Sequence, residues 1–309
     1  MNKIKVKFKK HVSINNLFIF ILLILNTTKC DTHLNENPLL LFISFDGFRW
    51  DYLTKYNLTS LNYLKQIGSY SDYVYSSFAT STFPNHWSLV TGLYEESHGI
   101  VSNEMFDPML NETFSMIKPN SHSFKWFGQN RLATPIWTLN QMNGNRRLSA
   151  AEWVGSNVVF FNQTIIDIPY EGSTPFNQYI DKFIKLFLNQ TNPINFGAIY
   201  FNEPGNKMNF KFKILFNKYF ILDQTGHMFG PFSNEMKLKL EEVDKNVGYL
   251  IDQLKKFNLF DSLNLIITSD HGMQNITNKT IIYLDDYVNT DLFDAYGGLV
   301  NLNLFIKNS

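Results

Sequence analysis

The succession of apolar runs along the chain constrains its fold more than any other feature of the sequence. Short, continuous runs rich in branched and aromatic residues alternate with stretches of helical periodicity. Runs of this length are typical of buried strands, and their alternation with helices is typical of a parallel sheet. The predicted strands are Leu39–Phe45, Leu148–Val154, Phe196–Phe201 and Leu263–Thr268. The sequence therefore predicts an α/β fold.

Between these strands, other patterns predict further elements. The spacing of apolar residues predicts helices over Trp50–Ile67 and Asn234–Phe257, and the residues Asp72–Phe78 read as extended. A helix is expected to begin at Pro84-Asn85, because proline is well tolerated in the first turn of a helix. No repeat and no long linker interrupts this organisation.

The first thirty residues predict a secretory signal peptide. Lys3–Lys10 form a basic segment, Leu17–Leu25 an apolar core, and Asn26–Cys30 a polar exit. An uncleaved membrane anchor is the alternative, but nine apolar residues rise only about 14 Å as a helix, roughly half of a bilayer core. We therefore expect residues 1–30 to be removed and 31–309 to be a secreted or cell-surface catalytic domain.

Composition supports this location and argues against nucleic-acid binding. Six of the 27 Lys and Arg residues lie in the first thirty positions, which hold no acidic residue, so the remaining chain is acidic. A net negative charge disfavours binding to a nucleic-acid polymer. The single cysteine, Cys30, leaves no disulfide for residues 31–309. Glycosylation sequons are expected at Asn57, Asn111, Asn162, Asn189, Asn275 and Asn278.

Acidic residues and histidines follow several of the predicted strands. Asp46 ends the first strand, and Asp270-His271 follows the last. Asp223 and His227 are spaced i, i+4, so one helical turn or tight loop can direct both toward one ion. Carboxylate and imidazole ligands suit a divalent transition metal, most commonly zinc. A lone Asp46 would more often be a turn residue, but the three groups together favour a metal.

Thr82 is the candidate nucleophile. It precedes the predicted helix start at Pro84, where a helix amino terminus favours negative charge. A threonine hydroxyl is a poor nucleophile at neutral pH unless a metal lowers its pKa. The competing interpretation is that Thr82 only caps the helix. We expect His86 and His98 to be hydrogen-bonded structural histidines.

These residues form an ordered set of motifs that resembles a known family. The set resembles the ectonucleotide pyrophosphatase/phosphodiesterase family of the alkaline phosphatase superfamily, from about residue 39 to residue 300. The matching segments are Phe45–Arg49, Ser81–Ile100, Asn103, Met105–Pro108, Pro135–Trp137, Trp153–Ser156, Tyr170–Ser173, Pro175-Phe176 and Ser269–Met273. The resemblance implies an alkaline-phosphatase-like, mostly parallel sheet with helices on both faces, incomplete at the C-terminus of this chain.

The resemblance also implies a site with two zinc ions. Asp46, Thr82, Asp270 and His271 would surround one ion, and Asp223 and His227 would hold the other. Thr82 would attack phosphorus and form a covalent nucleotidyl-threonine that water then hydrolyses. The backbone amide of Thr82 and the side chain of Asn103 would donate to the phosphoryl oxygen. Phe83 and Tyr170 match positions that stack on the nucleobase in relatives.

Two departures from the family pattern stand out. Residues Gly205–Leu222 separate Glu203-Pro204 from the Asp223 motif, and deleting them restores an uninterrupted family motif. A retained short intron would explain this segment, whereas an amphipathic surface insertion is the alternative. Relatives also carry a third zinc-binding histidine downstream, and no histidine follows His271 here. On these grounds the sequence reads as a truncated or mispredicted product.

The leading functional hypothesis is an extracellular, zinc-dependent nucleotide pyrophosphatase/phosphodiesterase that releases nucleoside 5′-monophosphates. Its expected partners are nucleotides or other small phosphodiesters. A choline-type phosphodiesterase of the same family is one alternative, and a catalytically impaired extracellular binding glycoprotein is another. Membrane association is expected only through an uncleaved N-terminal segment or a missing C-terminal one.

Overall fold

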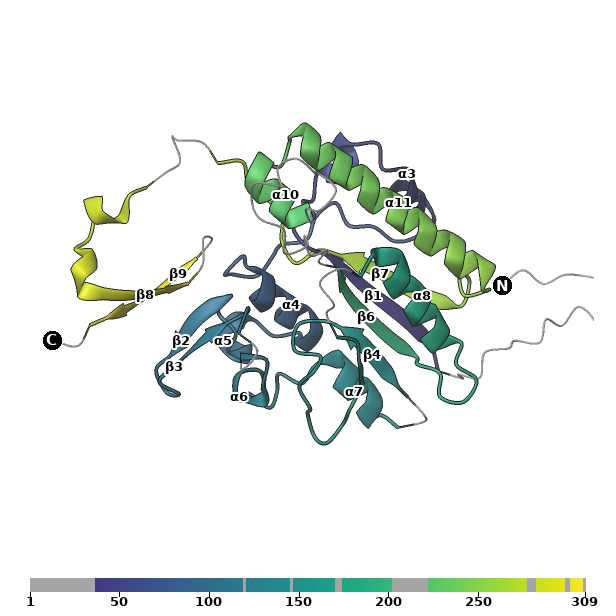
Figure 1. Cartoon of the computed structure of the whole chain (residues 1–309), viewed down its shortest axis with the longest axis horizontal. Coiled ribbons are helices and arrows are strands. Elements are labelled where there is room, and N and C mark those ends of the chain that lie inside the picture. Colours follow the sequence, from purple (N-terminus) through teal and green to yellow (C-terminus); the bar gives the residue numbers. More distant parts are fainter. Residues whose placement is uncertain are drawn as a thin grey trace, which may run out of the picture. The chain divides into compact units, whose positions relative to one another are not determined.

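The computed structural model describes residues 37–118, 121–144, 147–169, 174–201, 222–276, 282–297 and 301–307 (Figure 1). The predicted signal peptide lies outside these ranges, as do residues 205–221 of the predicted insertion. Leu222, assigned from the sequence to that insertion, is the first residue of helix α10 (Leu222–Phe229) and is buried in the core. No described helix is both long enough and apolar enough to cross a membrane.

Five parallel strands form the main sheet, in the order β5-β4-β6-β1-β7. The strands are β1 (Leu39–Phe45), β4 (Ser149–Glu152), β5 (Ile166–Asp167), β6 (Phe196–Phe201) and β7 (Leu263–Thr268). β1, β6 and β7 have the predicted bounds, and β4 is shorter than predicted. In register, Phe45 lies beside Phe201 and Ser44 beside Thr268, so β1, β6 and β7 end at one edge of the sheet.

Helices cover both faces of this sheet, which confirms the predicted α/β architecture (Figure 1). Alternate residues of β1 point to opposite faces, as a strand requires. Leu41 and Ile43 pack in a core with α8 (Phe176–Phe187) and α11 (Asn234–Lys256). Phe42 packs against a second core formed by α4 (Thr82–Thr91), α6 (Phe124–Phe127) and α7 (Ile136–Met142). Each fully buried large side chain contributes about 1.5–3 kcal/mol of hydrophobic stabilisation.

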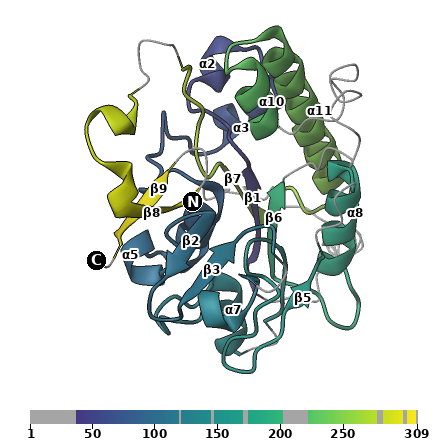
Figure 2. The same ribbon diagram turned by 60° about the vertical axis from the view of Figure 1, so that its left-hand side comes forward.

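Smaller elements surround the sheet. The short helix α5 (Glu95–His98) is followed by a hairpin of β2 (Glu104–Asp107) and β3 (Glu112–Ser115). A second hairpin, of β8 (Phe293–Gly297) and β9 (Leu302–Ile306), follows β7 near the C-terminal end of the described residues. Short 3-10 turns, Leu284–Asp286 and Thr290–Leu292, precede β8. The β8–β9 hairpin lies beside β2 (Figure 2), where Phe106 contacts Tyr296 at a ring-centroid distance of 4.8 Å.

The prediction of one continuous helix over Trp50–Ile67 is wrong. The structure has two helices, α2 (Tyr52–Lys55) and α3 (Thr59–Ile67), separated by an extended residue at Tyr56. The carboxylate of Asp244 in α11 accepts hydrogen bonds from the backbone amides of Ser60 and Leu61, at 3.1 and 2.9 Å. A remote side chain therefore satisfies the free amides at the start of α3 and stabilises a second helix start.

One further prediction needs correction. Asp72–Phe78, predicted to be extended, pairs with no strand of the described chain, and its side chains from Tyr73 to Tyr75 are exposed. Helix α4 begins at Thr82, before the predicted start at Pro84, and the preceding Ser81 has the extended backbone of an N-cap position. Thr82 is therefore the first helical residue rather than the cap itself.

Candidate active site

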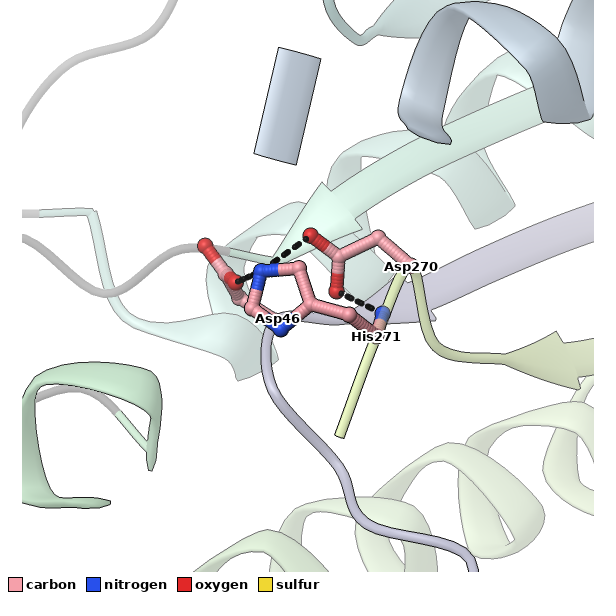
Figure 3. Close-up of side chains that lie close together, drawn as sticks. All are labelled: Asp46, Asp270 and His271. Atoms are coloured by element: carbon pink, nitrogen blue, oxygen red, sulfur yellow. Dashed lines mark hydrogen bonds and ion pairs between the residues drawn. The ribbon is translucent and has the colours of Figure 1, made fainter. Parts of the chain in front are cut away.

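The carboxyl ends of β1 and β7 bring Asp46, Asp270 and His271 together. His271 Nε2 lies 3.6 Å from Asp46 Oδ1 and 3.2 Å from Asp270 Oδ2. One ligand atom from each of the three residues falls within 4.8 Å of the others. Figure 3 shows the three side chains pointing toward one another, with dashed contacts from Asp46 and Asp270 to the imidazole of His271 and a third from Asp270 to the His271 backbone amide. This geometry suits a divalent cation with oxygen and nitrogen ligands.

Hydrogen bonds from backbone amides to side-chain oxygens join the loop after β1 to the loop after β7. The amide of Gly47 donates to Asp270 Oδ1 at 3.1 Å, and the amide of His271 donates to the same oxygen at 2.9 Å. Phe48 N donates to Ser269 Oγ at 2.9 Å. Asp270 Oδ1 therefore joins the loops after β1 and β7. The other oxygen, Oδ2, faces His271 Nε2.

Three carboxylate oxygens at this site are buried and have no hydrogen-bond partner among the described residues: Asp46 Oδ1, Asp223 Oδ1 and Asp270 Oδ2. Burial, followed by the charges of Asp270 and Asp223, raises the pKa of Asp46 well above its ordinary value. Buried anionic oxygens without partners are costly unless a cation neutralises them. The residues present therefore fit a bound metal ion.

Asp223 and His227 lie on one face of α10, as their i, i+4 spacing predicts. His227 Nε2 lies 3.3 Å from Asp223 Oδ2, and a hydrogen bond to this carboxylate raises the pKa of His227. Asp223 also packs against Gly47, whose φ is +69°. A Cβ at residue 47 would lie 2.9 Å from Asp223 Oδ1, so only glycine allows this close approach.

Thr82 is the first residue of α4 and lies beside the metal-ligand candidates. Its Oγ1 is 3.5 Å from His271 Nε2, so the hydroxyl can reach the same ion. Asn103 Oδ1 accepts a hydrogen bond from the backbone amide of Phe83 at 2.8 Å. This contact leaves the Asn103 amide hydrogens available to another acceptor.

Phe83, one of the two predicted base-stacking residues, is largely buried. Only 9% of its surface is exposed, and its ring packs near Phe114 and, edge-on, His122. Tyr170, the other predicted base-stacking residue, lies outside the described residues. The glycosylation candidate Asn278 also lies outside them, whereas the other five sequon asparagines are exposed.

Two residues that support the site were not singled out from the sequence as part of it. Tyr200, on β6, donates a hydrogen bond from Oη to Asp46 Oδ2 at 2.6 Å. His86, on α4, contacts both Thr82 and Asp270. The only available signal was position, since Tyr200 lies near the end of a buried strand and His86 lies one helical turn after Thr82.

Comparisons with known proteins show the family of this chain. Residues 40–307 match the family model described as type I phosphodiesterase/nucleotide pyrophosphatase. The chain belongs to this family. It is 43% identical over 256 residues to the bis(5′-adenosyl)-triphosphatase enpp4 of Xenopus laevis, covering 82% of this chain and 51% of that protein. It is 38% identical over 276 residues to the human ectonucleotide pyrophosphatase/phosphodiesterase family member 5, covering 89% and 53%.

Solved structures of this family share the fold. An inactive variant of murine ectonucleotide pyrophosphatase/phosphodiesterase 5, in complex with AMP, aligns with a TM-score of 0.70 at 35% identity. The alignment covers 88% of this chain and 67% of that chain. The human form aligns with a TM-score of 0.73 at 37% identity, covering 88% and 66%. This chain spans about half the length of the curated relatives named above.

Proposed function

We propose that this protein is an extracellular, zinc-dependent phosphodiesterase that hydrolyses nucleotide phosphodiester or pyrophosphate bonds and releases nucleoside 5′-monophosphates. One observation carries the proposal: Thr82 Oγ1 lies at a helix amino terminus, 3.5 Å from His271 Nε2, beside two buried carboxylates that each have an oxygen without a partner. A nucleophilic hydroxyl, a cation site and a helix terminus together suit attack on a phosphorus atom.

The proposed roles follow from where each group lies. Asp46, Thr82, Asp270 and His271 would hold one zinc ion, and Asp223 and His227 would contribute to a second. Bound zinc supplies a Lewis acid that lowers the pKa of the hydroxyl and offsets charge on the phosphoryl oxygens.

The reaction proceeds in two displacements. Thr82 Oγ1 loses its proton to solvent and forms a bond to phosphorus, while the bond to the leaving oxygen breaks and the leaving group departs with that electron pair. Water then attacks the same phosphorus and gives up a proton, the bond to Thr82 breaks as Oγ1 takes up a proton, and the nucleoside monophosphate is released. The backbone amide of Thr82 and the side-chain amide of Asn103 would donate to the phosphoryl oxygen.

Relatives support a nucleotide as the substrate. One is named a bis(5′-adenosyl)-triphosphatase, and the aligned murine structure is a complex with AMP. We propose that Phe83 and Tyr170 contact the nucleobase on this chain. Secretion is supported by the basic and apolar segments of residues 1–30 and by the exposure of Asn57, Asn111, Asn162, Asn189 and Asn275, at which we propose glycosylation.

Substitution of Thr82 tests this function. With a nitrophenyl ester of thymidine 5′-monophosphate, we expect Thr82→Ala to lower turnover by about three orders of magnitude or more, because the nucleophile is lost. Thr82→Ser, which keeps the hydroxyl, should retain measurable activity. Near-normal turnover of Thr82→Ala would contradict the proposal. Faster hydrolysis of glycerophosphocholine than of the nucleotide ester would move the substrate class to choline phosphodiesters.

A further inference from the structure

His86 occupies a position between the candidate nucleophile and the candidate metal ligands. Its side chain is fully buried. Nδ1 lies 2.8 Å from the carbonyl oxygen of Thr82 and 3.3 Å from Asp270 Oδ2. Nε2 lies 3.0 Å from Ser44 Oγ on β1. One imidazole therefore contacts the first turn of α4, the exit of β7 and strand β1.

These contacts fix the tautomer of the ring. A carbonyl oxygen can only accept a hydrogen bond. His86 Nδ1 therefore carries the proton and donates a hydrogen bond to the carbonyl oxygen of Thr82. The hydroxyl of Ser44, 3.0 Å from Nε2, is the hydrogen-bond partner of the other ring nitrogen. With a partner at each ring nitrogen, the imidazole has one stable orientation.

The surroundings hold the ring in place on its other sides. The ring centroid of Tyr200 lies 3.9 Å from that of His86, and the Trp153 ring lies edge-on at 5.1 Å. Trp153 Nε1 also donates to the backbone carbonyl of His86 at 3.0 Å. The sheet and the second core, formed with α4, α6 and α7, thus fix the position of the His86 ring. The ring in turn fixes the carbonyl of Thr82 through the hydrogen bond from Nδ1.

We propose that His86 is a positioning residue for the reaction at Thr82: its Nδ1–H group holds the carbonyl of Thr82, and with it the first turn of α4, at a fixed distance from Asp270. The effect on turnover rests on the function proposed above, whereas the effect on the turn rests on geometry alone. A misplacement of about 1 Å at a reacting group can lower a rate by about a hundredfold.

Two substitutions separate positioning from packing. In His86→Asn, the side-chain amide nitrogen takes the place of Nδ1 and can donate to the Thr82 carbonyl. In His86→Gln, the amide nitrogen instead reaches toward Ser44, near the place of Nε2. Asparagine leaves the larger cavity, so packing alone would favour glutamine. Positioning by Nδ1–H predicts the opposite order.

The control is His98→Gln. His98 is also fully buried, but it contacts Ser88 in the second half of α4, at 2.9 Å, and the amide of Ile100. This substitution removes a buried imidazole without touching the first turn. The decrease in melting temperature of His98→Gln therefore measures how much stability is lost when a buried histidine outside the first turn of α4 is replaced.

The experiment measures hydrogen exchange of the backbone amides of residues 85–88, zinc content, and kcat and KM for the thymidine nitrophenyl ester. We expect His86→Gln to accelerate this exchange and to lower kcat by about tenfold or more with little change in KM. His86→Asn should stay within about threefold of the unsubstituted protein in both exchange and kcat. His98→Gln should leave kcat per folded molecule unchanged.

Other results would overturn the proposal. If His86→Gln protects the turn as well as or better than His86→Asn, the histidine acts only by filling space. Equal losses in all three variants would lead to the same conclusion. If the unsubstituted protein hydrolyses no phosphodiester, the proposed function fails, yet the order of exchange rates still decides whether Nδ1–H holds the turn.

Discussion

At the scale of single residues, Tyr200 orients the carboxylate of Asp46, a candidate metal ligand. Its hydroxyl donates to Asp46 Oδ2 at 2.6 Å, while Asp46 Oδ1 faces the site without a partner among the described residues. Hydrogen bonds that orient metal ligands typically contribute tenfold to a hundredfold to metal affinity. The hydrogen bond from Tyr200 therefore leaves Oδ1 as the Asp46 oxygen that would face a bound cation.

Loss of this hydroxyl should weaken zinc binding. We expect Tyr200→Phe to raise the zinc dissociation constant by about tenfold or more, as measured by competition with a chromogenic chelator. Tyr249→Phe is a matched control, because Tyr249 Oη donates to Asp181 at 2.7 Å, between α11 and α8. Equal zinc affinity of both variants would show that Tyr200 does not orient the ligand.

The sequence could predict Asp46, Asp270 and His271 because each directly follows an apolar strand, and parallel strands end at one edge. It could not predict the roles of Tyr200 and His86. Tyr200 stands within a buried strand, where an aromatic residue needs no functional explanation, and its partner Asp46 is 154 residues away. His86 was expected to be a hydrogen-bonded structural histidine, but its partners on β1 and after β7 depend on the packing of the whole sheet.

At the scale of elements, the loop before α4 is held by a buried polar cluster of Ser77, Asn85 and Glu95. Asn85 Nδ2 donates to the carbonyls of Ala79 and Ser81, at 3.0 and 2.9 Å. Asn85 Oδ1 accepts from the amide of Ser77 at 2.8 Å, and the Ser77 hydroxyl donates to Glu95. Hydrogen bonds from the protein interior therefore anchor the start of α4.

Glu95 should make stability depend on pH. Burial raises its pKa above the ordinary value, so the folded state binds the proton more tightly than the unfolded state. Its stabilising contribution is then complete below the unfolded pKa of about 4.3 and is lost as pH rises through the higher folded pKa. We expect Glu95→Gln to gain stability relative to the unsubstituted protein between about pH 4 and pH 7.

Urea unfolding of both proteins across this pH range provides the measurement. Because other carboxylates titrate in both proteins, the informative quantity is the difference between the two free energies of unfolding. A difference that does not vary with pH would mean that Glu95 has the same proton affinity in both states.

Element boundaries were predicted well where local sequence determines them and poorly where a distant residue does. The bounds of β1, β6 and β7 follow from their own apolar runs. The break between α2 and α3 depends on Asp244, which lies 184 residues from Ser60 and whose carboxylate caps the second helix. No local pattern around Tyr56 carries that information.

At the scale of the whole molecule, a metal ion at the candidate site would couple metal binding to folding. Asp46, Asp223 and Asp270 converge from three separate segments, and burial, followed by the charges of Asp270 and Asp223, raises the pKa of Asp46. A cation that binds only the folded state stabilises it, by about 2.7 kcal/mol at a concentration one hundred times the dissociation constant. The melting temperature should therefore rise with zinc and fall after chelation.

Differential scanning calorimetry with and without zinc measures this coupling. Asp270→Asn removes one anionic ligand, so its melting temperature should respond less to zinc than that of the unsubstituted protein. Identical melting temperatures with zinc and with excess chelator would argue against a metal site at this edge of the sheet.

The stereochemistry of hydrolysis at phosphorus tests the central claim most directly. With a thymidine nitrophenyl phosphorothioate of one configuration, hydrolysed in oxygen-labelled water, each in-line displacement inverts the phosphorus centre. Attack by Thr82 followed by attack by water is two displacements, so the account predicts net retention of configuration. Net inversion would show that water attacks the substrate directly and would contradict the covalent role of Thr82.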